Sequence, residues 1–396
     1  MSENVIILGA GFSYNAGIPL LGNFIERMWE FSVRGKSGDK ELSQSEKEIL
    51  SNALNIRREL DGYHGRVSFD DRNLKDILSI LAFNVLGGGQ KDRNKLTAFA
   101  NAISTTIELS CGVKHEGFRK DGRFSIIKDG DDIYRAFWRS LFNWKKNGNE
   151  LPTLITFNYD LVLERALLQT LINTYYSGYE QRAPFESISL DYKYKLFPPD
   201  NYKVNYVTYG FDRAKAGSAI EIVESVNENT HLNVELLKLH GSLNYPRTSS
   251  QAKKQEKNLV GVLENPYIIP PVSNKQSSSA GDESWRTALI RMRQAKNIVF
   301  VGYSLPKTDM YMQFFLKAAL GPNQELNRIT VFDPTLWKGN SETKDMRARY
   351  ESCFAEQQRS RLDFNPTVFR EKDLEFAGTA RHFIQKLTNN PNEILF

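Results

Sequence analysis

The stretch VIILGAG, residues 5–11, decides the fold that we expect for this chain. Four consecutive apolar residues that end at a glycine are typical of a short strand buried on both faces, as in a parallel sheet. A helical pattern of apolar residues follows through Phe24, Ile25, Met28 and Trp29. The chain therefore opens with a strand, a tight glycine turn and a helix.

The same pattern recurs along the chain. Further short apolar segments that we expect to be strands lie at residues 154–157, 236–239, 298–301 and 329–332. Helical apolar spacing follows the first of these at 161–171 and the third at 309–320. Alternating strands and helices imply a parallel sheet with helices on both faces. We therefore predict an α/β fold with a Rossmann-like parallel sheet.

Two regions interrupt the alternation. Residues 35–149 show helical periods and are expected to form a helical insert between the first and second strand units. Residues 176–230 are mixed and rich in tyrosine and charge, and we expect a smaller insert there. The core is then predicted to consist of residues 1–34, 150–175 and 231–390.

Composition indicates a large globular protein. The chain has 396 residues, 40% of them hydrophobic, and a formal net charge of +5 spread among acids, so we do not expect direct nucleic-acid binding. Its two cysteines lie far apart, which excludes a disulfide framework and a cysteine-based zinc site. No apolar run approaches the roughly 20 residues that span a bilayer, and the first strand follows the start directly. We expect a cytoplasmic protein with no membrane partner.

The first candidate motif is the glycine turn, which contains Gly9, Ala10, Gly11 and Ser13. Glycines after a buried strand let the backbone approach a diphosphate, and the helix N-terminus that follows favours an anion. The dinucleotide fingerprint is incomplete, because Tyr14 stands where its third glycine is usual. A tight strand-to-helix turn without a ligand is the alternative.

The other motifs place polar residues where expected strands end. Asn158 and Asp160 follow the second strand, and both residue types are also good helix caps, which explains one of them better than both. His240 ends a later strand before Gly-Ser, a setting that favours general-base work over the structural role of most lone histidines. Gly302 and Ser304 follow another strand and are suited to contact a phosphate or a ribose.

In this order the motifs resemble the signature of the sirtuin superfamily. That signature has Gly-Ala-Gly, a serine and Gly-Ile-Pro, found here within residues 9–19, then T-x-N-x-D at 156–160, L-H-G-S at 239–242 and G-x-S-L at 302–305. The resemblance extends to about residue 334 and implies that 1–396 is a sirtuin-like catalytic region.

The chain is more similar to one branch, the bacterial sirtuin-like domains of antiphage defence systems. It shares with them IIPP at 268–271, Trp285 at a helix start and GYSLP at 302–306. Members are usually NAD glycohydrolases. The zinc module of deacylating sirtuins, with its two Cys-x-x-Cys pairs, is absent here, and Leu20-Leu21 stands where deacylases continue with Asp-Phe. The resemblance therefore argues against protein deacylation.

The resemblance also implies roles for the motif residues. Asn158 would contact the nicotinamide ribose and orient the attacking water, Asp160 would accept a hydrogen bond from the nicotinamide carboxamide, and His240 would take a proton from a ribose hydroxyl or from the water. The diphosphate and its neighbouring ribose would be held by Gly9, Ala10, Gly11 and Ser13. The adenosine side would be lined by Gly302, Ser304 and Asp333. No metal and no cofactor beyond NAD+ itself, the substrate, is implied.

The function expected from this resemblance is NAD+ hydrolysis to nicotinamide and ADP-ribose, which would deplete cellular NAD as an antiphage effector. Regulation through a homo-oligomer or a HerA-type ATPase partner is expected with it. The alternative is a catalytically silent binder of ADP-ribose or a cyclic nucleotide signal that regulates a partner effector. The presence of both Asn158 and His240 argues for the enzyme, since a pure binder needs neither.

Overall fold

The structure is a computed structural model with side chains. It describes residues 2–113, 115–116, 125–126, 133–176, 187–194, 208–211, 220–222, 231–248, 250–251, 260–269, 282–307, 309–364, 366 and 371–395. Most of the predicted mixed insert at 176–230 lies outside these residues.

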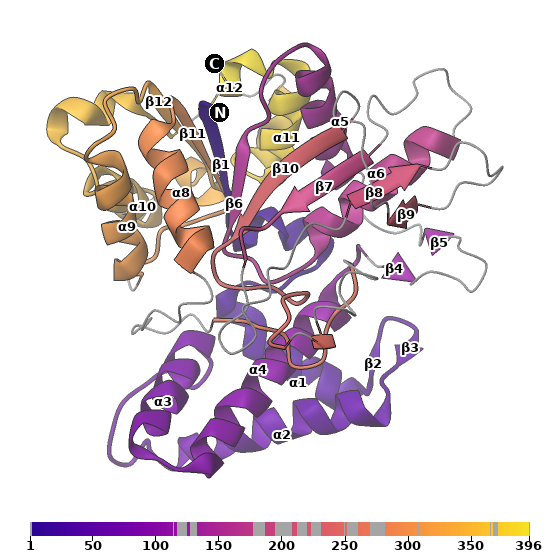
Figure 1. The fold of residues 1–396 in the computed structure, drawn as a ribbon. Coiled ribbons are helices and arrows are strands. Elements are labelled where there is room, and N and C mark those ends of the chain that lie inside the picture. Colours follow the sequence, from indigo (N-terminus) through magenta and orange to yellow (C-terminus); the bar gives the residue numbers. More distant parts are fainter. Residues whose placement is uncertain are drawn as a thin grey trace.

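A central sheet organises the molecule (Figure 1). Its seven parallel strands lie side by side in the order β13 (Leu362–Asp363), β12 (Arg328–Phe332), β11 (Asn297–Val301), β1 (Asn4–Leu8), β6 (Thr153–Thr156), β10 (His231–Lys238) and β7 (Ser187–Asp191). Two antiparallel strands, β8 (Thr208–Phe211) and β9 (Ile220–Ile222), extend the β7 edge. The predicted Rossmann-like parallel sheet is confirmed.

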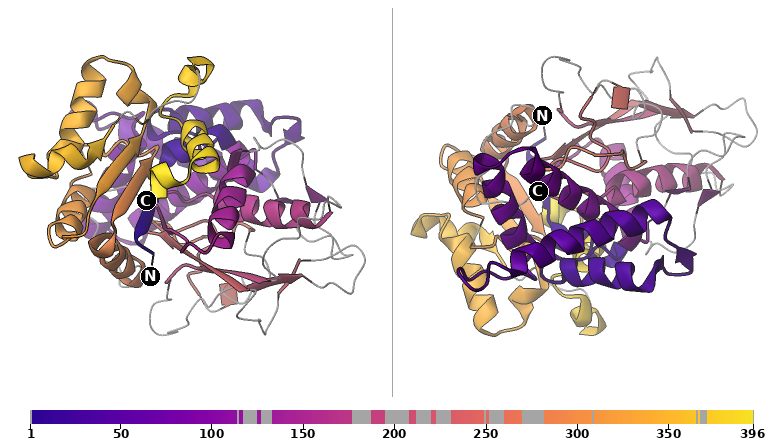
Figure 2. Two further views of the ribbon diagram at one scale, coloured as in Figure 1. Left: turned by 90° about the horizontal axis from the view of Figure 1, so that it is seen from above. Right: turned by 90° about the horizontal axis from the view of Figure 1, so that it is seen from below.

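Helices cover both faces of this sheet, because side chains of a buried strand alternate between two cores. On β1, Ile6 and Leu8 belong to one core and Val5 and Ile7 to the other. The first core lies under α5 (Ile133–Lys146), α6 (Val162–Tyr176) and α11 (Ala380–Asn389). The second lies under α8 (Asp282–Gln294), α9 (Met310–Leu320) and α10 (Ser341–Glu351). Figure 2 shows the two helix layers on opposite sides of the strands.

A helical layer lies beyond the carboxyl ends of the strands (Figure 1). It consists of α1 (Phe24–Arg34), α2 (Gln44–Asp61), α3 (Leu74–Gly87) and α4 (Gln90–Ser110), and α2 and α4 pack along each other. We call α2, α3 and α4 the helical insert, as predicted between the first two strand units. Helix α2 begins at a capping box in which the Ser43 side chain accepts from the Glu46 amide.

Other elements of the 35–149 region differ from its helical pattern. Two short strand pairs occur there, β2 (Lys36–Ser37) with β3 (Lys40–Glu41) and β4 (His115–Glu116) with β5 (Ser125–Ile126). Helix α5 packs on α6 and α11 beside the sheet. The short helix α12 (Asn392–Leu395) ends the described chain. Within the described residues, no helix is both long enough and apolar enough to cross a membrane.

Candidate functional site

A cavity lies between the carboxyl ends of the central strands and the helical insert. The free space in the cavity and its open mouth together is about 900 Å³. All four sequence motifs contribute to its wall. The predicted site residues that line it are Ala10, Asn158, Asp160, His240, Gly302 and Ser304.

The glycine turn packs directly on the turn after β11. The Gly9 amide donates to Val301 O at 2.9 Å, and the Gly11 amide donates to Gly302 O at 2.9 Å. A Cβ on Gly9 would lie 2.4 Å from Gly302 O, and Gly302 itself has φ +64°. These glycines are therefore required for the approach of one protein backbone to another, a reason that differs from the ligand approach inferred from the sequence.

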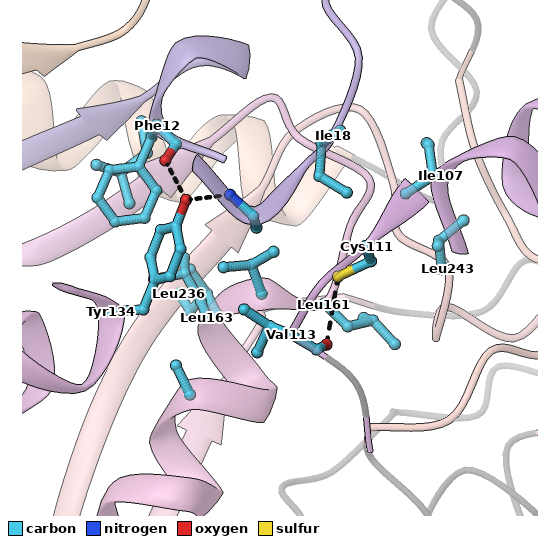
Figure 3. Packing of buried hydrophobic residues seen from close by; sticks show 14 of the residues in the cluster. Phe12, Ile18, Ile107, Cys111, Val113, Tyr134, Leu161, Leu163, Leu236 and Leu243 are labelled. Atoms are coloured by element: carbon cyan, nitrogen blue, oxygen red, sulfur yellow. Dashed lines mark hydrogen bonds between the residues drawn. The ribbon is translucent and has the colours of Figure 1, made fainter. Parts of the chain in front are cut away.

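The segment after the glycine turn is held from behind by α5. It forms two short 3₁₀ helices, Ala10–Phe12 and Tyr14–Ala16. The Tyr134 hydroxyl donates to Phe12 O at 2.8 Å and accepts from the Ala16 amide at 3.0 Å (Figure 3). Because Tyr134 is 1% exposed, these two bonds join the segment to the protein interior.

Asn158 and Ser13 connect the second motif to the first. The Asn158 amide group donates to Gly9 O at 2.8 Å and to Ser13 Oγ at 3.0 Å. Both N–H groups of the side chain are thereby used, which leaves its oxygen to accept a hydrogen bond from a hydroxyl or a water in the cavity. Ser13 is 1% exposed, so it orients Asn158 from behind the cavity wall.

Asp160 combines a capping role with a place in the cavity wall. Its carboxylate accepts from the amide of Val162, the first residue of α6, at 3.0 Å and so satisfies an amide at the start of this helix. Burial raises the pKa of this carboxyl, while the Lys238 charge, the Val162 amide and the Ser13 hydroxyl act in the opposite direction.

His240 lies among aromatic rings at the end of β10. Its ring centroid is 5.1 Å from that of Phe157 and 6.3 Å from that of Trp285. The backbone turns sharply after it, because Gly241 has φ +84° and a Cβ there would lie 2.2 Å from Tyr267 O. This turn directs the chain away from the sheet and leaves the imidazole in the cavity wall.

Asp309 is a further polar group of the cavity wall. Its carboxylate caps α9 by accepting from the Met312 amide at 3.3 Å and accepts the Tyr303 hydroxyl at 2.8 Å. Both Asp309 and Tyr303 line the cavity. The side chain is therefore a cap and a part of the site at once.

Asp333 lies apart from the lining residues. Its carboxylate accepts from the Thr335 amide at 2.9 Å and caps the 3₁₀ helix Pro334–Trp337, and burial raises its pKa. The structure thus assigns Asp333 a capping contact, and its expected place beside the adenosine stays a prediction.

Sequence reasoning missed the apolar wall. Phe24 of α1, Leu74 of α3, and Ile103 and Ile107 of α4 line the cavity opposite the motif residues. Their spacing is that of any helix core, so no local signal distinguishes them from packing residues. Tyr159, which donates from its hydroxyl to Ile269 O at 2.6 Å, lies inside a motif that was found but was not singled out.

One cluster outside the cavity has ligand-type atoms. Asp61, His64 and Asp71, in the insert and the loop after α2, bring one such atom each within 4.8 Å of one another. Asp71 is already paired with Arg57, and exposed acidic groups commonly gather without an ion. The cluster therefore does not by itself support a metal site.

Comparison with known proteins gives limited similarity. No family model matches the chain, and no curated protein matches it. Among solved structures, the chain is similar to a Sir2 protein crystallised with an inhibitor, 2′-O-acetyl-ADP-ribose and a deacetylated peptide. The alignment covers 98% of this chain and 94% of the Sir2 chain. The sequence identity is 11% and the TM-score is 0.34. The fold and the cavity stand on the strand order, contacts and distances of this chain.

Proposed function

We propose that the chain is an NAD+ glycohydrolase that releases nicotinamide and ADP-ribose. The observation that supports this most is the meeting of Asn158, Asp160 and His240 in one cavity wall at the carboxyl edge of a parallel sheet. Ligands of open α/β sheets bind at this edge, and the three side chains offer an acceptor, a carboxyl and a base. The proposal includes NAD+ as the substrate and no metal or further cofactor.

The reaction requires few catalytic side chains. The bond between the nicotinamide nitrogen and the ribose carbon breaks, and its electron pair leaves with neutral nicotinamide. A water oxygen then bonds to the ribosyl carbon through an oxocarbenium-like transition state. The Asn158 oxygen would orient that water or a ribose hydroxyl, and His240 would accept the released proton. Asp160 would face the positively charged reactant, which favours its ionised form.

The apolar wall suits a planar ring more than a phosphate. Phe24, Leu74, Ile103 and Ile107 form a surface on which a nicotinamide could be shielded from water. Among the described lining residues none is lysine or arginine. In the glycine turn the amides of Gly9, Gly11, Phe12 and Ser13 already donate to main-chain oxygens, so the diphosphate would depend on the Ala10 amide of this turn.

We further propose the cellular setting that the motif resemblance implies: a cytoplasmic antiphage effector that depletes NAD. Free NAD hydrolysis would harm the host cell, so gating by homo-oligomer assembly or by a HerA-type ATPase is part of this proposal. Size measurement of the purified chain, alone and with a candidate ATPase, tests the assembly, and NAD consumption in both states tests the gate.

The first test of the reaction is NAD cleavage by wild type and by His240→Ala and Asn158→Ala, with products resolved by chromatography. We expect nicotinamide release by wild type, and losses on the order of 100-fold or more in both variants because base and orienting group are removed. The product trace also separates linear from cyclic ADP-ribose.

Matched controls lie at the opposite end of β10. His231 and Asn233 are at its amino end, away from the cavity, so His231→Ala and Asn233→Ala should retain cleavage. Full activity in both site variants would refute the assignment of the site. Tight NAD binding without cleavage, with or without the partner, would favour the silent nucleotide binder.

A further inference from the structure

A lysine is buried directly behind the proposed reaction site. Lys238 is the last residue of β10, two residues before His240, and its side chain is 1% exposed. Lysine is almost never fully buried unless its charge is paired. Its partner is Glu164 on α6, with a side-chain exposure of 0% and an N–O distance of 2.9 Å.

The lysine also contacts the turn that carries Asp160. Its ammonium group donates to the main-chain oxygen of Asp160 as well as to the Glu164 carboxylate. The Tyr192 hydroxyl donates to the same Glu164 oxygen at 3.1 Å, so a neighbouring strand end holds the glutamate in place. One ammonium group thus joins the sheet, α6 and the Asp160 turn.

Two main-chain hydrogen bonds from residues that follow Lys238 complete this connection. The Leu239 amide donates to Thr156 O at 2.9 Å, and the Leu243 amide donates to Tyr159 O at 2.9 Å. The turn with Asp160 and the turn with His240 are therefore held together as one unit. Lys238 supplies the one side-chain ammonium contact described in that unit.

The charge of Lys238 acts on the Asp160 carboxyl. It opposes the effect of burial and outweighs the contribution of Glu164, which raises the pKa of Asp160. The titratable groups around this carboxyl are Lys238 on β10, Glu164 on α6, Cys111 after α4 and, in the same cavity wall, Tyr159, His240 and Asp309.

We propose that Lys238 is a positioning residue for the reaction: paired with Glu164, it fixes the Asp160 turn against the strand that carries His240 and places a positive charge beside the Asp160 carboxyl. This inference rests on the proposed function and adds to it a residue that does not touch the cavity. It acts through Asp160, and its removal should change how Asp160 ionises as well as how it is oriented.

The test compares two variants by the pH dependence of kcat for NAD cleavage. Single loss of Lys238 would leave Glu164 as an unpaired buried charge, whereas replacing both partners of a buried ion pair is often tolerated. The double variant K238M/E164Q should fold, and its kcat should fall on the order of 10–100-fold. The low-pH limb of its kcat–pH profile should move to higher pH. E164Q alone keeps the lysine beside Asp160 and should move that limb to lower pH.

Opposite shifts are the decisive feature, because a general loss of packing would move both variants the same way. The matched control is K145M/E150Q, which removes an ion pair of the same types near the amino ends of the strands and should leave the profile unchanged. Acid limbs that stay at the wild-type pH in both variants overturn the inference, whatever the loss in kcat. Should E164Q fail to fold, the shift of the double variant decides.

Failure of the proposed function would be distinguishable. If wild type cleaves no NAD with or without a partner, the reaction is refuted, and the titration of Asp160 is then followed by carboxyl ¹³C NMR, with D160N to assign the signal. A pKa of Asp160 that is higher in K238M/E164Q and lower in E164Q supports the placement of the Lys238 charge beside the Asp160 carboxyl. An unchanged titration in both variants overturns it.

Discussion

Asp160 is a residue at which proposed function and folding stability oppose each other. Burial raises the pKa of its carboxyl, so the folded state retains this proton to higher pH than the unfolded state. The stability that the protonated form contributes is complete below the unfolded pKa and is lost as the pH rises through the folded pKa. Ionisation of this carboxyl in the folded state is therefore a cost in stability that a functional site retains.

Asp160→Asn should remove this cost. The new side chain can still accept from the Val162 amide, and the buried Lys238–Glu164 pair is left electrically neutral. We expect the variant to have a higher Tm than wild type at pH 8, a smaller difference at pH 4, and no NAD cleavage. Thermal unfolding of wild type and variant, monitored by circular dichroism across this pH range, measures the difference in Tm.

The control for this substitution is Asp39→Asn in the exposed turn between β2 and β3, which should leave the Tm unchanged at each pH. Parallel Tm curves for wild type and Asp160→Asn would show that ionisation of Asp160 is not linked to folding.

At the scale of elements, α5 supports the segment after β1 through one side chain. Tyr134→Phe keeps the ring and its edge-to-face contact with Phe12 but removes two hydrogen bonds. The buried Ala16 amide and Phe12 carbonyl would lose this partner, at a cost of about 1–3 kcal/mol in the free energy of unfolding. Because Ala10 belongs to the same segment, we expect KM for NAD to rise as well.

Urea unfolding and steady-state kinetics measure the two effects of Tyr134→Phe. Tyr63→Phe, in the exposed turn that follows α2, is the matched control. A lower free energy of unfolding with an unchanged KM would mean that Tyr134 contributes to stability only and that α5 does not influence NAD binding.

At the scale of the whole molecule, the reactivity of the Cys111 thiol indicates how often the helical insert opens away from the sheet. It follows α4, is 1% exposed, and lies beside Leu161 and Val113 (Figure 3). Burial raises the pKa of its thiol to about 12, so almost no reactive thiolate is present near pH 8. Arg165 of α6, paired with Glu108 of α4 at 2.9 Å, joins the same two parts.

Iodoacetamide at pH 8 should therefore modify Cys353, which is partly exposed, long before Cys111. Mass spectrometry of digested protein gives both rates, and urea-unfolded protein, in which the two should react alike, is the control. Equal rates in native protein would mean that the insert opens readily and that the cavity has no lasting wall on that side.

The sequence by itself determined the parallel sheet and four of its turns. The runs at 5–8 and 298–301 are apolar on both faces and end at glycine, and this is a local property that needs no partner to be recognised. Parallel strands bring their carboxyl ends to one edge, so Asn158 and His240 could be placed near each other from chain order alone.

Tertiary structure alone decided what surrounds those turns. The apolar wall from Phe24, Leu74 and Ile107 and the Lys238–Glu164 pair join residues distant in the chain or buried behind the motifs. The reason is physical. Apolar spacing predicts that a side chain is buried, but it does not predict which residues it packs against or whether it lines a cavity. Likewise, a glycine marks a close approach, and only the folded chain shows that the approaching group is the backbone of Gly302.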